Sequence, residues 1–101
     1  MKNKPLIIDI LGYNYTVLLD ADITRRGREG ECDPEKEIIR VSAHLTSRGF
    51  AETLLHEILH AITVIGLDEG NRLTELQVNY LAAMLIEVLR RNPSLKGILM
   101  P

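Results

Sequence analysis

The stretch "SRGFAETLLHEILHAITVIG", residues 47–66, divides this chain into two unlike halves. Apolar residues recur within it at three- and four-residue spacing, the period of a helix that covers a core with one face. They are Phe50, Leu54, Leu55, Ile58, Leu59, Ile62 and Ile65. Gly66 ends the run, so we expect a helix over about residues 47–66.

The residues before this stretch have the pattern of β-strands. "PLIIDILG" and "YTVLLD" are short β-branched runs separated by "GYN", which predicts a hairpin. "EGECDPEKEIIRVS" predicts a second hairpin, in which Asp33 and Pro34 begin the turn and "EIIRVS" is the returning strand. Between the hairpins, "ADITRRGR" has no clear period, and we expect an irregular surface loop there.

The residues after the stretch predict one more long helix. "LDEGNR" is a loop, the helix is expected over about residues 73–91, and "NP" stops it. Its apolar side is expected to carry Leu76, Leu81, Leu85, Val88 and Leu89. Strands over about residues 5–42 followed by two packed helices predict a single α+β domain over residues 1–101, with a small antiparallel or mixed sheet of three to four strands.

Composition and charge exclude several classes of protein. The hydrophobic fraction of 46% and the charged fraction of 26% are those of an ordinary globular protein. The net charge of −2 and the lack of a long Lys/Arg cluster predict no nucleic-acid partner, and we interpret "TRRGRE", residues 24–29, as a solvated loop. No signal peptide and no run of roughly 18 apolar residues is recognised, which predicts no membrane association and a cytoplasmic location. The single Cys32 cannot form an internal disulfide.

The most apolar part of the first helix, "LLHEILHAI" (residues 54–62), contains three polar residues. His56 and His60 are four apart, so their Cβ atoms lie about 5–6 Å apart on one helix face and both imidazoles can bind one Zn²⁺. Glu57 lies about 100° further round the helix, where it can act as general base toward an attacking water in the HExxH pattern. Alternatively, the histidines are core residues that bond to the backbone, but two of three histidines at metal-binding spacing favour the metal.

A catalytic zinc site needs a third protein ligand and an open position. Asp68 and Glu69 lie in the expected loop, and Glu87 lies three turns along the second helix. Glu75 lies in the first turn of that helix, so antiparallel packing of the two helices would point its carboxylate at the histidines. Alternatively, Glu75 is a favourable anion at a helix N-terminus. Asn79 follows one turn later, and its side-chain oxygen could accept a hydrogen bond from a ligating imidazole.

"TLLHEILHAI" followed by "LTELQVNYLAAML" resembles the gluzincin branch of zinc metallopeptidases. It is more closely similar to the small ImmA/IrrE-type zincins and their phage- and prophage-encoded relatives, over about residues 47–91. The resemblance implies a minimal zincin-like fold with His56, His60 and Glu75 as Zn²⁺ ligands, Glu57 as general base and Asn79 in support. It also implies a zinc metalloendopeptidase that acts on a peptide or protein substrate, in the host cytoplasm if the chain is phage-encoded.

Further residues are candidates for the remaining catalytic roles. The tetrahedral oxyanion needs stabilisation, for which zinc itself can serve and His44, Tyr80, Tyr13 and Tyr15 are candidate helpers. The alternative is that these four are ordinary surface or half-buried residues. An extended peptide could pair with the edge of the sheet, and "EIIRVS" is the candidate edge strand.

The competing hypothesis is a non-catalytic zinc-binding module for protein–protein contact on a zincin scaffold, as in a phage or prophage accessory protein. In that case Cys32 or His44 would close the fourth position of the metal. Zinc-dependent hydrolysis of another amide, such as a cell-wall peptide link, is a third reading. The exposed face of the second helix and the apolar tail are compatible with a homo-oligomer.

Overall fold

The computed structural model describes residues 5–23 and 27–101. Its elements, in chain order, are β1 (Leu6–Ile10), β2 (Tyr13–Asp20), β3 (Gly30–Asp33), β4 (Ile38–Ser42), α1 (Ser47–Gly66), the 3₁₀-helix η2 (Glu69–Asn71), α2 (Glu75–Arg91) and α3 (Leu95–Leu99). A mixed four-stranded sheet followed by helices confirms the predicted α+β class. Part of the basic patch, residues 24–26, lies outside the described residues.

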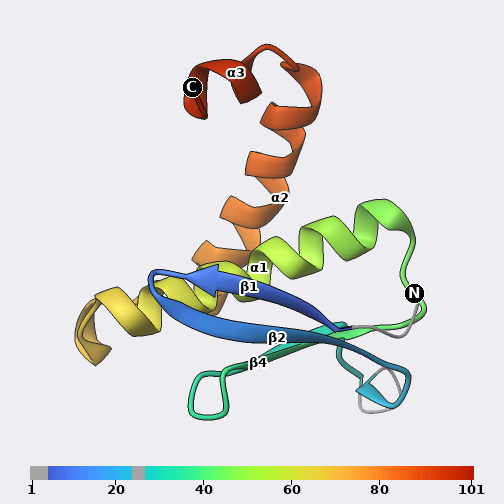
Figure 1. Cartoon of the computed structure of the whole chain (residues 1–101), viewed down its shortest axis with the longest axis vertical. Coiled ribbons are helices and arrows are strands. Elements are labelled where there is room, and N and C mark those ends of the chain that lie inside the picture. Colours follow the sequence, from blue (N-terminus) through green and yellow to red (C-terminus); the bar gives the residue numbers. More distant parts are fainter. Residues whose placement is uncertain (1–4, 24–26) are drawn as a thin grey trace.

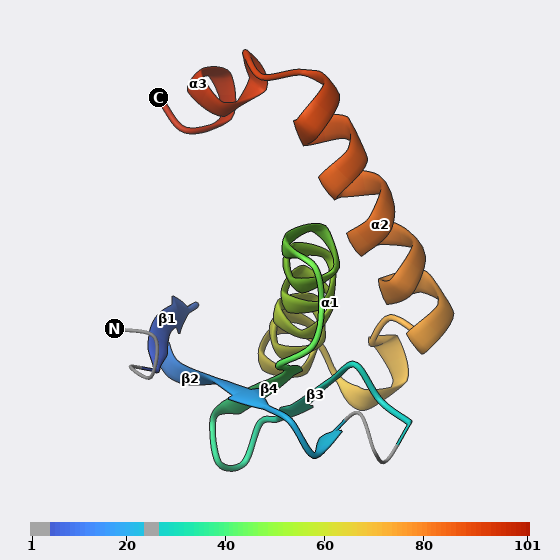
Figure 2. The ribbon, with the colours of Figure 1, turned by 90° about the vertical axis from the view of Figure 1, so that its right-hand side faces the viewer.

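The described strands form one sheet in the order β1-β2-β4-β3. β1 pairs with β2 in antiparallel register, β2 pairs with β4 in parallel, and β3 pairs with β4 in antiparallel register. Figure 2 shows both long helices on the same side of this sheet. The sheet is therefore two hairpins joined side by side through a parallel pair.

The first hairpin turns through two residues whose backbones are left-handed. Leu11 has φ 52° and Gly12 has φ 94°. Two positive φ values in a two-residue loop are those of a type I′ turn, whose twist matches that of the flanking strands. The Asp9 carboxylate also accepts a hydrogen bond of 2.7 Å from the Gly12 backbone N–H. The predicted hairpin is confirmed, but its turn consists of Leu11 and Gly12 and not of "GYN", since Tyr13 and Asn14 already belong to β2.

The second hairpin forms as expected, but its returning strand is not the edge of the sheet. β4 lies between β2 and β3, with Ile39 and Val41 fully buried. The edge strands of the described sheet are β1 and β3, and each residue of β3 is only half-buried. The expectation that "EIIRVS" is the edge strand is therefore wrong, because the backbone of β4 pairs with β2 on one side and with β3 on the other.

The core lies between the sheet and α1. Its buried members are Ile10, Tyr15, Val17, Ile39, Val41 and Ala61. Four of the apolar positions predicted for the helix pack against this cluster, namely Phe50, Leu54, Ile58 and Ile65. The helical period of the sequence therefore identified the face of α1 that meets the sheet.

α2 begins at Glu75, two residues later than expected, because Thr74 is its N-cap. The Thr74 hydroxyl accepts a hydrogen bond from the Gln77 backbone N–H, and the Gln77 side-chain oxygen accepts one from the Thr74 N–H. This reciprocal capping box satisfies two backbone donors at the helix start. It also places Glu75 in the first turn, next to α1.

Figure 1 shows α2 crossing α1 and rising away from the sheet, rather than lying alongside α1 as expected. Val78 and Ala82 are the buried residues of α2, which packs mainly against α1. The residues predicted for its apolar side are instead exposed, namely Leu76, Leu81, Leu85, Val88 and Leu89. None of the helices in the described part of the chain combines the length and the hydropathy needed to cross a bilayer.

Candidate metal centre

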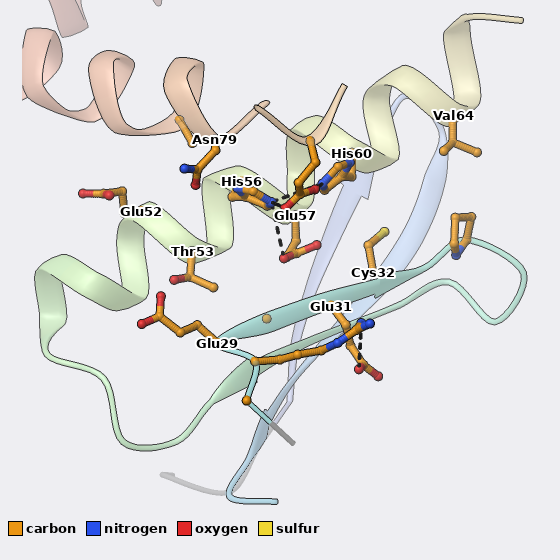
Figure 3. Close-up of a pocket in the computed structure, with 16 residues that line it drawn as sticks. Glu29, Glu31, Cys32, Glu52, Thr53, His56, Glu57, His60, Val64 and Asn79 are labelled. Carbon is orange, nitrogen blue, oxygen red and sulfur yellow. Dashed lines mark hydrogen bonds and ion pairs between the residues drawn. The ribbon is translucent and has the colours of Figure 1, made fainter. Parts of the chain in front are cut away.

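Two imidazoles from α1 and a carboxylate from α2 converge on one point. The Nε2 atoms of His56 and His60 lie 3.1 Å apart, as expected for side chains one helical turn apart. One Glu75 oxygen lies 3.0 Å from His56 Nε2, and the other lies 2.6 Å from His60 Nε2. Figure 3 shows both imidazoles projecting from the same side of α1 into the cleft. The predicted convergence of these three side chains is thus present although the helices cross.

Hydrogen bonds alone do not satisfy all three contacts. With neutral imidazoles and an ionised carboxylate, each Nε2 supplies at most one hydrogen. If both hydrogens go to Glu75, the 3.1 Å contact between the two nitrogens has no hydrogen in it. If one imidazole donates to the other instead, its contact with Glu75 has none. A cation at the centre would accept one lone pair from each of the three side chains at once.

The distances fit a metal ion. Bonds of about 2.0–2.1 Å in a tetrahedral site put the ligand atoms about 3.3–3.4 Å apart. The 3.1 Å and 3.0 Å contacts of His56 Nε2 are close to this spacing, and the 2.6 Å contact of His60 with Glu75 would lengthen around an ion. The ligand atoms of His56, Glu57 and His60 also lie within 4.8 Å of one another, close enough to hold a metal ion. Within this wider group Glu57 is the more distant carboxylate, since its nearest oxygen is 4.0 Å from His56 Nε2. Glu75 is therefore the better third ligand on distance.

Glu57 is buried between α1 and the sheet. Only 5% of the residue is exposed, and Figure 3 shows its side chain directed from α1 toward the strand that carries Cys32. Burial raises the pKa of Glu57 to about 7, the charges of Glu75 and Glu31 add to the shift, and Arg28 opposes it. A divalent cation beside Glu57 would lower this pKa again, because it stabilises the charged form.

The metal-free protein should lose stability as pH rises because of Glu57. The folded-state pKa of about 7 lies above the ordinary value of 4.5, so the folded state binds the proton more tightly. This contribution is complete below about pH 4.5, is lost as pH rises through about 7, and totals on the order of 3 kcal/mol. Denaturant unfolding with chelator at pH 5 and pH 8 measures it. Glu57→Gln should show a weaker dependence, and equal dependence in both proteins would contradict this origin.

A cleft of about 730 Å³ contains the centre. Its walls are α1 and the start of α2 on one side, and β3 with the preceding loop on the other. Carboxylates dominate the lining, namely Glu29, Glu31, Glu52, Glu57 and Glu75. Among the described lining residues Arg28 is the one Lys or Arg, and it lies 3.9 Å from Glu31. The cleft is therefore open, polar and negatively charged.

The structure brings some of the other candidate residues to this cleft and not others. Asn79 lines it, although the described hydrogen bonds do not join Asn79 to either histidine. Cys32 also lines it, and in the metal-free protein burial raises the pKa of its thiol to about 12, so the thiol is protonated there. None of the described contacts joins Cys32 to His56, His60 or Glu75.

The candidate oxyanion donors lie outside the lining of the cleft. His44 is exposed between β4 and α1, where its backbone N–H donates a 3.2 Å hydrogen bond to Ser42 Oγ. Tyr80 and Tyr13 are largely exposed, and Tyr15 is fully buried in the core. None of these four side chains belongs to the described lining of the cleft.

Sequence reasoning missed the part of the cleft that β3 supplies. Gly30 lies in this strand against α1, where Thr53 and Glu57 face it. A glycine inside a strand often marks a close approach of another group, and this signal in "EGEC" could have identified the contact.

Comparisons of this chain with protein-family models, curated proteins and solved structures found no match. The resemblance to zincins therefore rests on the residues of the centre themselves.

Proposed function

We propose that this chain is a zinc-dependent peptidase in which His56, His60 and Glu75 hold the metal and Glu57 is the general base. The observation that carries the proposal is the approach of Glu75, from a second helix, to within 3.0 Å of His56 Nε2 and 2.6 Å of His60 Nε2. A satisfied pair of core histidines does not need a carboxylate from another element at that point.

The donor set supports zinc as the metal. Two imidazoles and one carboxylate are the protein ligands of many catalytic zinc sites, which keep a fourth position open. The side chain of Glu75 is 73% exposed, so the centre is open to solvent on that side. Bound zinc would lower the pKa of a water molecule to about 7 and polarise a substrate carbonyl.

The chain's own residues supply the remaining steps. Glu57 accepts the proton of the attacking water and then delivers it to the leaving amine, which is general base and then general acid catalysis. Its burial beside the histidines, with 5% of the residue exposed, holds the carboxylate near the reacting atoms and away from bulk water. β3 is an edge strand of the described sheet and lines the cleft, so an extended peptide could lie along it.

The charge of the cleft supports a peptide rather than a nucleic acid as substrate. The glutamates of its lining would repel phosphate groups and attract basic side chains. Peptides that contain lysine or arginine are therefore the first choice of substrate.

The test is hydrolysis of a mixture of quenched-fluorescent peptides, half of which contain lysine or arginine, by the zinc-loaded protein. We expect cleavage with about one zinc per chain, loss of cleavage on chelation, and recovery when zinc is added back. Mass spectrometry of the products identifies the bond that is cut. Stoichiometric zinc without any cleavage would favour the non-catalytic binding module, and no zinc binding would exclude both.

A further inference from the structure

The edge strand β3 meets α1 at a position that has no room for a side chain. A Cβ atom built on Gly30 would lie 2.6 Å from Thr53 Cγ2, 2.9 Å from Glu57 Oε2 and 3.2 Å from Glu57 Cγ. Carbon atoms in contact normally lie about 3.5–4.0 Å apart, so even one methyl group overlaps two side chains of α1. The backbone of Gly30 does not have a positive φ, so it is space, and not backbone conformation, that favours glycine here.

The two obstructing side chains would respond differently to a methyl group at Gly30. Thr53 is β-branched, and its Cγ2 has few alternative rotamers on a helix. The Glu57 carboxylate is the far end of a flexible side chain, so it can move away. A side chain at position 30 therefore displaces the carboxylate that the proposed function uses as the base.

We propose that Gly30 is a positioning residue, whose missing side chain leaves the space against β3 in which the Glu57 carboxylate lies. The inference rests on the proposed function for its effect on catalysis. Gly30 is the first residue of β3, and as a glycine it costs conformational entropy on folding and gives the strand no side-chain packing. The space that it leaves is filled by Glu57 and Thr53.

Gly30→Ala should lower kcat by about 10- to 100-fold, because a displacement of about 1 Å in a reacting group can cost a factor of 100. Zinc content should stay close to that of the wild type, since the three atoms nearest a Cβ at Gly30 belong to Thr53 and Glu57 and not to a proposed ligand. The melting temperature should also fall, because the new methyl group overlaps Thr53. Gly70→Ala is the matched control, because a Cβ at Gly70 meets nothing within 4 Å.

A second substitution separates packing from positioning. Thr53→Ser removes the Cγ2 atom, so the Gly30→Ala/Thr53→Ser double variant keeps only the overlap with Glu57. We expect the double variant to regain most of the melting temperature lost by Gly30→Ala. Its kcat should stay low relative to that of Thr53→Ser alone. Recovery of kcat together with stability would overturn the proposal, and so would loss of zinc from Gly30→Ala.

An NMR measurement, which does not depend on activity, tests the role of Gly30 separately from the proposed peptidase function. The carboxyl carbon of Glu57, followed by ¹³C NMR in the zinc-loaded protein and assigned by Glu57→Gln, should shift in Gly30→Ala and in the double variant. If the wild type hydrolyses no peptide but this resonance shifts as expected, the peptidase proposal fails and the placement of Glu57 by Gly30 stands. An unchanged resonance overturns the positioning role whatever the activity.

Discussion

Glu57→Gln is expected to lower kcat for peptide hydrolysis by about 10²- to 10⁴-fold, the usual contribution of a positioned general base. Glutamine has nearly the same size and fits the same buried space, but its amide cannot accept the proton of the attacking water. Zinc affinity should change little, because the nearest Glu57 oxygen lies 4.0 Å from His56 Nε2, beyond the spacing of the three proposed ligands. Initial rates at saturating peptide, measured together with zinc content, test both statements.

The control for Glu57→Gln is the same substitution at Glu69. This residue is exposed in η2 and does not line the cleft, so Glu69→Gln should retain the wild-type rate. A Glu57→Gln protein that holds zinc and hydrolyses peptide at the wild-type rate would remove Glu57 from the proposed mechanism.

Removing a ligand should have the largest effect on metal binding. We expect His60→Ala to weaken zinc binding by about 100-fold or more, since loss of a group that only supports a ligand already costs about 10- to 100-fold. At a free zinc concentration of about 100 times the wild-type Kd, binding stabilises the folded state by about 2.7 kcal/mol, which raises Tm by roughly 10–20 °C. A 100-fold weaker site gains only about 0.4 kcal/mol at the same concentration, or roughly 2–3 °C.

Thermal melts of wild type and His60→Ala with buffered zinc and with chelator measure this difference. A His60→Ala protein with the wild-type rise in Tm would show that the histidine pair does not hold the metal. The metal-free melts are the control, because they separate a change in zinc affinity from a change in the packing of α1.

Glu75→Gln decides between the two carboxylates beside the histidines. If Glu75 is the third ligand, Glu75→Gln should lose most of the zinc-dependent rise in Tm, whereas Glu57→Gln should keep it. The opposite result would assign the metal to His56, Glu57 and His60, the group whose ligand atoms lie within 4.8 Å of one another. That outcome would remove the general base and favour a binding module.

Tertiary contacts explain where the sequence-based expectations of the fold failed. Strand pairing was predicted only within hairpins, because turn residues such as Gly12 reveal local pairing. The parallel pairing of β2 with β4 joins segments about 20 residues apart, and it is this pairing that places β4 inside the sheet and leaves β3 at the edge. The apolar side predicted for α2 is exposed for a similar reason. Only the contact of α2 with α1 determines which of its faces is buried.

The sequence by itself determined the features that depend on neighbours along the chain. These include the helix over residues 47–66, the placement of His56 and His60 on one face of it, and the two hairpins, because helical periodicity and turn chemistry act over a few residues. Only the tertiary structure decided which groups from other elements complete the centre. Glu75 reaches the histidines from a helix that crosses α1 instead of lying alongside it, and Gly30 meets Glu57 because the start of β3 lies against α1. Such contacts depend on how whole elements bury their apolar faces against one another, which no local pattern specifies.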